Sequence, residues 1–102
     1  IQPLCDSPSP YTEYMKAGIQ GLHHVQFTTD DMDGAIAKAV ANGLDPACII
    51  DGTGGGKYTY LRGPGVWFEV MEANEGLMGL FAFIKSKCEN WDGETLIEDF
   101  GL

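Results

Sequence analysis

Alternation of apolar and polar positions along the chain predicts four β-strands, at residues 22–29, 47–50, 57–61 and 66–71. A stripe of apolar residues at helical spacing predicts a helix between the first two strands, made by Met32, Ala35, Ile36, Ala39 and Val40. Asp31 stands before this stripe as an N-cap and Gly43 after it as a stop. These residues therefore delimit one strand–helix–strand–strand–strand unit.

Two further helices flank this unit. Ser9 followed by Pro10 is typical of a helix start, and Gly18 would end that short helix. After Asn74, a second apolar stripe predicts a helix that runs to about Cys88, with Leu77, Leu80, Phe81 and Ile84 along it. We expect both stripes to cover one apolar face of the sheet, which gives an α+β fold.

The two sheet faces differ in chemistry. The helix-covered face is expected to carry Val25, Phe27, Val66, Phe68 and Val70, and the other face His24, Gln26, Thr28, Trp67 and Glu69. His23 is expected on the helix side, although a shift of one residue in register would exchange the two histidines. A polar, histidine-bearing sheet face either is solvated or lines a cleft.

His24 and Glu69 are the candidate site residues on that face. An imidazole nitrogen and a carboxylate oxygen suit a divalent metal such as Zn, Ni, Co, Mn or Fe, but a catalytic metal needs about three protein ligands. Gln26 and Tyr60 are weaker additions. The residues alone also allow the alternative that His24 is a partly buried polar residue and Glu69 a solvated one.

Composition narrows the classes of partner. The 102 residues fit one domain, and the net charge of -9 argues against nucleic acid and against anionic membrane surfaces. No apolar run reaches the length of about 18 residues that a membrane span needs.

Three scattered cysteines favour reduced thiols and an intracellular protein, in the cytoplasm or an organelle matrix. The glycine-rich turn at 51–56 lacks the spacing of a phosphate-binding loop and opens no helix.

Several segments, taken together, resemble the glyoxalase / vicinal oxygen chelate superfamily. They are Gly21-Leu-His-His-Val-Gln-Phe27, Asp30-Asp-Met-Asp33 at a helix start, Tyr58-Thr-Tyr-Leu61 and Val66-Trp-Phe-Glu-Val70. The lead-in before Gly21 is similar to the joint between the two modules of methylmalonyl-CoA epimerase-like members. The last helix with Trp91-Asp-Gly93 is similar to an extension of lactoylglutathione lyase-like members.

The resemblance implies a βαβββ module in which His24 and Glu69 are metal ligands and Glu69 also takes part in catalysis. It implies that a second module, or a second copy in a homodimer, completes the cleft with two more ligands. The expected activity is that of a divalent-metal-dependent lyase or isomerase, which acts on a small molecule with vicinal oxygens through an enolate or enediolate.

This resemblance divides the chain into three segments: an inter-module lead-in at 1–20, the βαβββ module at 21–73, and a C-terminal helix and tail at 74–102. The absence of a first module before the lead-in, and a first residue other than Met, favour a C-terminal piece of a longer protein over a homodimer. In either case we expect Trp67 to be exposed to water in a single module.

Two other functions stay open. One is a metal-independent module that holds an aromatic or anionic small molecule between Tyr58, Tyr60 and Trp67, with Gln26 nearby. The other is a metal-dependent dioxygenase, which normally requires two histidines and one glutamate on iron.

Overall fold

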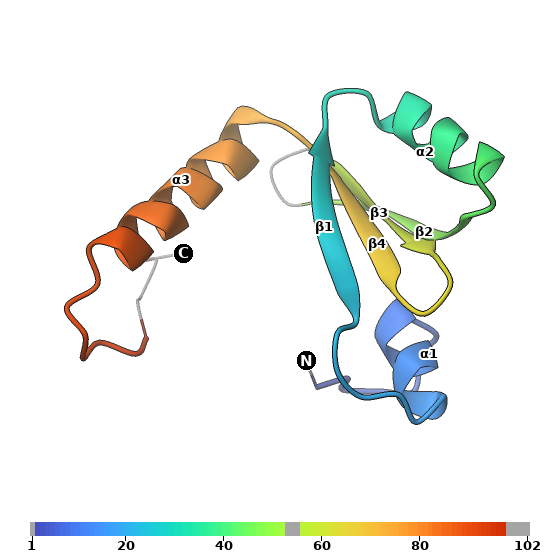
Figure 1. The fold of residues 1–102 in the computed structure, drawn as a ribbon, viewed down its shortest axis with the longest axis horizontal. Coiled ribbons are helices and arrows are strands. Elements are labelled where there is room, and N and C mark those ends of the chain that lie inside the picture. Colours follow the sequence, from blue (N-terminus) through green and yellow to red (C-terminus); the bar gives the residue numbers. More distant parts are fainter. Residues whose placement is uncertain (1, 53–55, 98–102) are drawn as a thin grey trace.

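The computed structural model describes residues 2–52 and 56–97, which form an α+β fold with a four-stranded sheet and three helices (Figure 1). The elements are α1 (Pro10–Lys16), β1 (His24–Thr29), α2 (Met32–Ala41), β2 (Asp45–Asp51), β3 (Lys57–Arg62), β4 (Trp67–Glu72) and α3 (Glu75–Glu89). The predicted order of helices and strands is confirmed. The middle of the glycine-rich turn, 53–55, and the end of the expected tail, 98–102, lie outside the described residues.

The sheet is mixed, with strand order β1-β4-β3-β2. β2, β3 and β4 form an antiparallel meander, and β1 pairs in parallel with β4, the last strand of the unit. β1 and β2 are therefore the edge strands. Pro46 lies in β2, where an edge position tolerates the missing N–H, and a register shift follows between Pro46 and Cys48.

Side-chain caps begin all three helices where the sequence predicts them. Ser9 Oγ accepts from the N–H of Thr12 at 3.1 Å, and Thr12 Oγ1 accepts from the N–H of Ser9 at 2.8 Å, a reciprocal capping box at α1. Asp31 accepts from the N–H of Gly34, and Asn74 accepts from the N–H of Leu77, each at 2.9 Å. These local bonds satisfy donors that a helix start leaves free.

The core lies between α2 and one face of the sheet. Met32, Leu61 and Val70 are its buried centre, and Ala35, Ile36, Ala39, Leu44 and Phe68 pack around them. This confirms the predicted role of the first apolar stripe. Phe27 was expected under the same helix but is 55% exposed. It lies on the edge strand β1, whereas α2 packs against β2 and β4.

The second apolar stripe does not cover the sheet, which corrects the prediction for α3. No residue of α3 is buried, and the helix extends away from the sheet after residues 73–74 (Figure 1). Its large exposed side chains include Met78, Leu80, Phe83 and Ile84. The projecting helix raises the radius of gyration to 15.8 Å, above the ~13 Å of a compact chain of about 100 residues.

None of the helices within residues 2–52 and 56–97 combines the length and the apolar character that a bilayer crossing requires.

The contrast between the two stripes predicts unequal costs of truncation. Leu61→Ala should lower the free energy of unfolding by about 2–5 kcal/mol, because it leaves a cavity beside Met32 and Val70. Met78→Ala, on exposed α3, should change it by less than about 0.5 kcal/mol. Urea unfolding followed by circular dichroism measures both. Equal losses in the two variants would contradict the position of the core.

Candidate functional site

The parallel pairing of β1 with β4 brings His24 and Glu69 together. His24 lies opposite Trp67 in this register, and Gln26 lies opposite Glu69, so the imidazole and the carboxylate are diagonal neighbours on one sheet face. His24 Nε2 is 3.2 Å from Glu69 Oε2. Glu69 is only 8% exposed, whereas the imidazole of His24 keeps a quarter of its surface in solvent. The two candidate residues thus meet on the face that α2 leaves open.

His23 also lies on this side, contrary to the prediction that it faces the helix. Its Nδ1 is 2.9 Å from Nδ1 of His24, and its Nε2 is 3.2 Å from the carbonyl oxygen of Pro10. His23 precedes β1 and is free of the strict alternation of a strand. The ring therefore turns toward α1 and packs beside His24 instead of entering the core.

α1 adds an aromatic side chain to the site that sequence reasoning missed. The hydroxyl groups of Tyr11 and Tyr60 are 2.6 Å apart, and the ring of Tyr11 stacks on His23 with centroids 4.7 Å apart. The ring of Tyr60 meets His24 edge-on at 5.5 Å. Burial is the main cause that raises the pKa of Tyr60, followed by its hydrogen bonds with Tyr11 and Glu69. Tyr60 therefore keeps its proton beside the Glu69 carboxylate.

Trp67 is buried, at 7% exposed, which corrects the expectation of a solvent-exposed ring. His23 stacks on one part of it at 5.8 Å, and the guanidinium of Arg62 lies 5.0 Å from the ring centroid. Arg62 in turn binds Glu13 of α1 through both carboxylate oxygens and also pairs with Asp45. The chain's own lead-in thus covers this end of the sheet.

The remaining predicted binding residues, Tyr58 and Gln26, lie on the same face. Tyr58 contacts Tyr60 edge-on at 6.2 Å, and Gln26 is exposed and donates to the sulfur of Met71. Within the described part of the chain, neither side chain makes a hydrogen bond with His24 or Glu69. The structure therefore places Tyr60, Trp67 and Gln26 beside the candidate pair, although the amide of Gln26 binds Met71 and not Glu69. Tyr58 contacts the pair's neighbour Tyr60.

The pair fits half of a metal site. An imidazole nitrogen and a carboxylate oxygen 3.2 Å apart can both approach one ion at about 2.0–2.2 Å. Within residues 2–52 and 56–97, however, the structure has no group of three or more His, Cys, Asp or Glu side chains that could hold a metal. The described residues thus supply two donors, and any further protein ligands must come from elsewhere.

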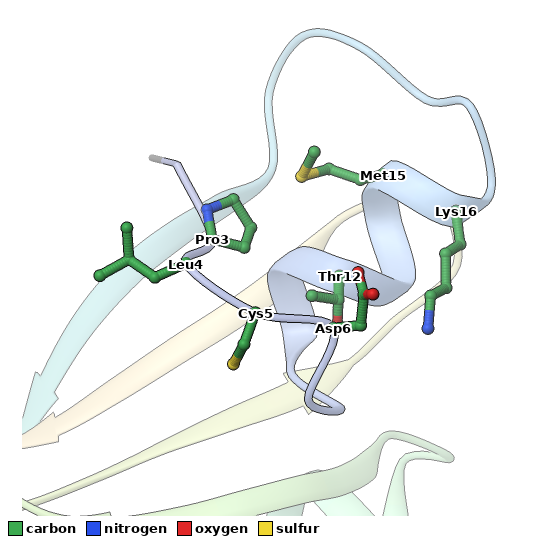
Figure 2. A pocket seen from close by; sticks show the side chains of 7 residues that line it. All are labelled: Pro3, Leu4, Cys5, Asp6, Thr12, Met15 and Lys16. Atoms are coloured by element: carbon green, nitrogen blue, oxygen red, sulfur yellow. The ribbon is translucent and has the colours of Figure 1, made fainter.

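A hollow of about 460 Å³ lies away from this pair, between residues 3–6 and α1 (Figure 2). Pro3, Leu4, Cys5 and Asp6 line one side of it, and Thr12, Met15 and Lys16 line the other. Leu4 points outward and is almost fully exposed. This open surface shares no lining residue with the His24–Glu69 site, so its size alone does not make it the functional centre.

The contributions of Pro10, Tyr11 and His23 could not be read from local sequence patterns. The polar contacts that place α1 join residues far apart in the chain, with 13 positions between Pro10 and His23 and 49 between Tyr11 and Tyr60. They depend on where α1 lies against the end of the sheet. The only signal in the sequence is the pair of adjacent histidines. It does not indicate which of the two rings donates a hydrogen bond to the other.

Comparisons with known proteins support the fold. No family model matches the chain, and the search of curated proteins finds no match. Among solved structures, the crystal structure of a hypothetical protein from Bacillus halodurans C-125 is similar, with a TM-score of 0.54 and 23% sequence identity. The match covers 72% of this chain and 56% of that protein, so the chain spans little more than half its length. A likeness at this identity concerns the fold alone.

The raised pKa of Tyr60 predicts a loss of stability in alkali. In the unfolded chain a tyrosine ionises near pH 10, whereas folded Tyr60 stays protonated, so its contribution is fully present below pH 10 and falls as the pH rises above it. This group alone can lower the free energy of unfolding by at most about 1.4 kcal/mol per pH unit. Urea unfolding between pH 9 and pH 11 should show a shallower decline for Tyr60→Phe than for the wild type. Identical declines in the two proteins would contradict the raised pKa of Tyr60.

Proposed function

We propose that this chain is a glyoxalase-type module that contributes His24 and Glu69 to a divalent metal site, and that a second module or a second copy of the chain supplies the other ligands. The observation that carries the proposal is the 3.2 Å approach of His24 Nε2 to Glu69 Oε2 on one sheet face. Glu69 is buried without a lysine or arginine partner among the ion pairs of the described residues. A buried carboxylate favours a cation close by.

The arrangement of elements supports the same proposal. Within the unit from β1 to β4 the order is strand, helix and three strands, as the resemblance to the vicinal oxygen chelate superfamily implies. The two residues that the resemblance marks as ligands come from its first and last strands. Their convergence depends on the parallel pairing of those strands, which is not a feature of the local sequence.

The activity we propose is that of a lyase or isomerase acting on a small molecule with vicinal oxygens. A bound divalent metal would polarise those oxygens and stabilise an enolate or enediolate. Glu69 is the candidate for holding or moving the proton, since its carboxylate is an acid–base group 3.2 Å from Nε2 of His24. Tyr60 stays protonated beside it and can donate a hydrogen bond to the carboxylate. Buried aromatic rings around the pair limit the access of water.

The two alternative functions gain no specific support. A dioxygenase would need a second histidine ligand, but both ring nitrogens of His23 already have partners in His24 and Pro10. A metal-independent aromatic pocket would need an accessible Trp67, but this ring is covered by His23 and Arg62. We therefore favour the metal-dependent lyase or isomerase.

Metal titration of the assembled site, either this chain with its second module or a dimer of this chain, tests this function. Addition of Co²⁺, Ni²⁺, Zn²⁺ or Mn²⁺ should raise the melting temperature, and a chelator should reverse the rise. His24→Ala and Glu69→Gln should each weaken metal binding more than about 100-fold, because loss of an outer-shell partner alone typically costs ~10–100-fold. Isothermal titration calorimetry measures the affinity, and one ion for every two chains is expected if a second copy completes the site.

Glu72→Gln is the matched control for this experiment. Glu72 belongs to the same strand, and its carboxylate accepts from the N–H of Lys57 away from His24. The amide oxygen of glutamine can accept the same bond, so metal affinity should stay within a few-fold of the wild type. An equal loss in Glu72→Gln and Glu69→Gln, or no response of the assembled wild-type site to any of the four metals, would overturn the proposed function.

A further inference from the structure

We infer that His23 is a positioning residue that selects the tautomer of His24, so that Nε2 of His24 is left free to bind a cation. The inference rests on the proposed function and extends it to the lead-in, because the Pro10 carbonyl orients His23. The lead-in would then be part of the site as well as a connection between modules.

The direction of each hydrogen bond follows from the groups involved. A carbonyl oxygen only accepts, so the 3.2 Å contact between His23 Nε2 and the Pro10 oxygen places a proton on that nitrogen. A neutral imidazole then has an unprotonated Nδ1, which accepts. The 2.9 Å contact between the two Nδ1 atoms therefore requires the proton to come from His24.

This chain of bonds fixes the chemistry of His24 Nε2. A neutral His24 that carries its proton on Nδ1 has a lone pair on Nε2, the atom 3.2 Å from Glu69 Oε2. Two acceptors then face each other, which is unfavourable unless a cation or a proton lies between them. A histidine that ligates a metal almost always donates its other ring N–H to a partner that fixes the tautomer. Here that partner is His23.

The ring of His23 is held in the plane that this role needs. Tyr11 stacks on it at 4.7 Å with an interplanar angle of 23°, and Trp67 stacks on it at 5.8 Å with an angle of 14°. Rotation of the ring out of this plane would break both stacking contacts. A half-turn within the plane would break the bond to Pro10, so that bond keeps Nδ1 directed toward His24.

α1 is itself attached to the sheet near this point. The hydroxyl of Tyr11 binds that of Tyr60 at 2.6 Å, and Arg62 of β3 binds Glu13 at 2.8 Å. Both contacts join α1 to the strand next to Glu69 in the sheet. The Pro10 carbonyl thus has a fixed place relative to the His24–Glu69 pair.

Two substitutions of His23 separate its hydrogen bonds. His23→Asn places an amide oxygen near the position of Nδ1, where it can still accept from His24. His23→Gln places its amide near the position of Nε2, so it can reach Pro10 but leaves His24 Nδ1 without its acceptor. Both variants lose the imidazole ring, so a general effect of that loss on folding should be similar in the two. Thermal unfolding verifies that each is folded.

Nuclear magnetic resonance of the metal-free protein, with ¹⁵N-labelled histidines, reads directly which ring nitrogens carry protons. We expect His24 to carry its proton on Nδ1 and His23 on Nε2 in the wild type. His24 should keep this tautomer in His23→Asn and lose its preference in His23→Gln. Affinity for Zn²⁺ should fall about 10–100-fold in His23→Gln and only a few-fold in His23→Asn.

The outcomes distinguish this inference from the proposed function. A wild-type His24 without a proton on Nδ1 overturns the inference, even if Zn²⁺ binds. Equal Zn²⁺ affinities of the two variants also overturn it, since a purely structural role of His23 predicts no difference. If the expected tautomers are found but none of the metals binds, the proposed function fails while the assignment of the hydrogen bonds stands.

Discussion

The parallel pairing of β1 with β4 is the constraint on which the rest of the structure depends. It joins the two ends of the strand–helix–strand–strand–strand unit, and its register puts His24 across from Trp67 and diagonal to Glu69. A shift by one residue would send the imidazole to the face that α2 covers and expose Val25 in its place. Strand alternation links the two faces of the sheet. Burial of Leu61 and Val70 under α2 therefore also determines which side chains lie on the opposite face.

The helices and strands could be predicted because the signals that specify them lie in residues close together in the sequence. Ser9, Asp31 and Asn74 each bind a backbone N–H three residues ahead, so a helix start is specified within one turn of chain. The strands likewise follow from alternation, and their observed bounds differ from the predicted ones by no more than two residues at each end. Alternation also predicted the side of its own strand on which each of His24 and Glu69 lies, but their approach depends on the pairing of β1 with β4.

The errors concern burial, which depends on residues far away in the sequence. The stripe in α3 has the spacing of a core helix, yet spacing does not state what lies opposite, and the described residues leave this helix uncovered. Trp67 is buried and His23 is turned because α1 packs against the end of the sheet, a position set by Tyr11 with Tyr60 and by Glu13 with Arg62. Neither contact has a periodic signature.

Two parts of the protein, the sheet and the segment before it, determine different properties of the candidate site. The sheet determines where His24 and Glu69 lie, because strand pairing sets their separation. The lead-in determines which imidazole nitrogen faces the carboxylate, because Pro10 and His23 set the direction of the hydrogen bonds. With only two donors among the described residues, neither part can enclose an ion, which normally needs three or four protein ligands. In the proposed function, metal retention is therefore a property of the assembled pair of modules, while the identity of the ligating atoms is already decided within one.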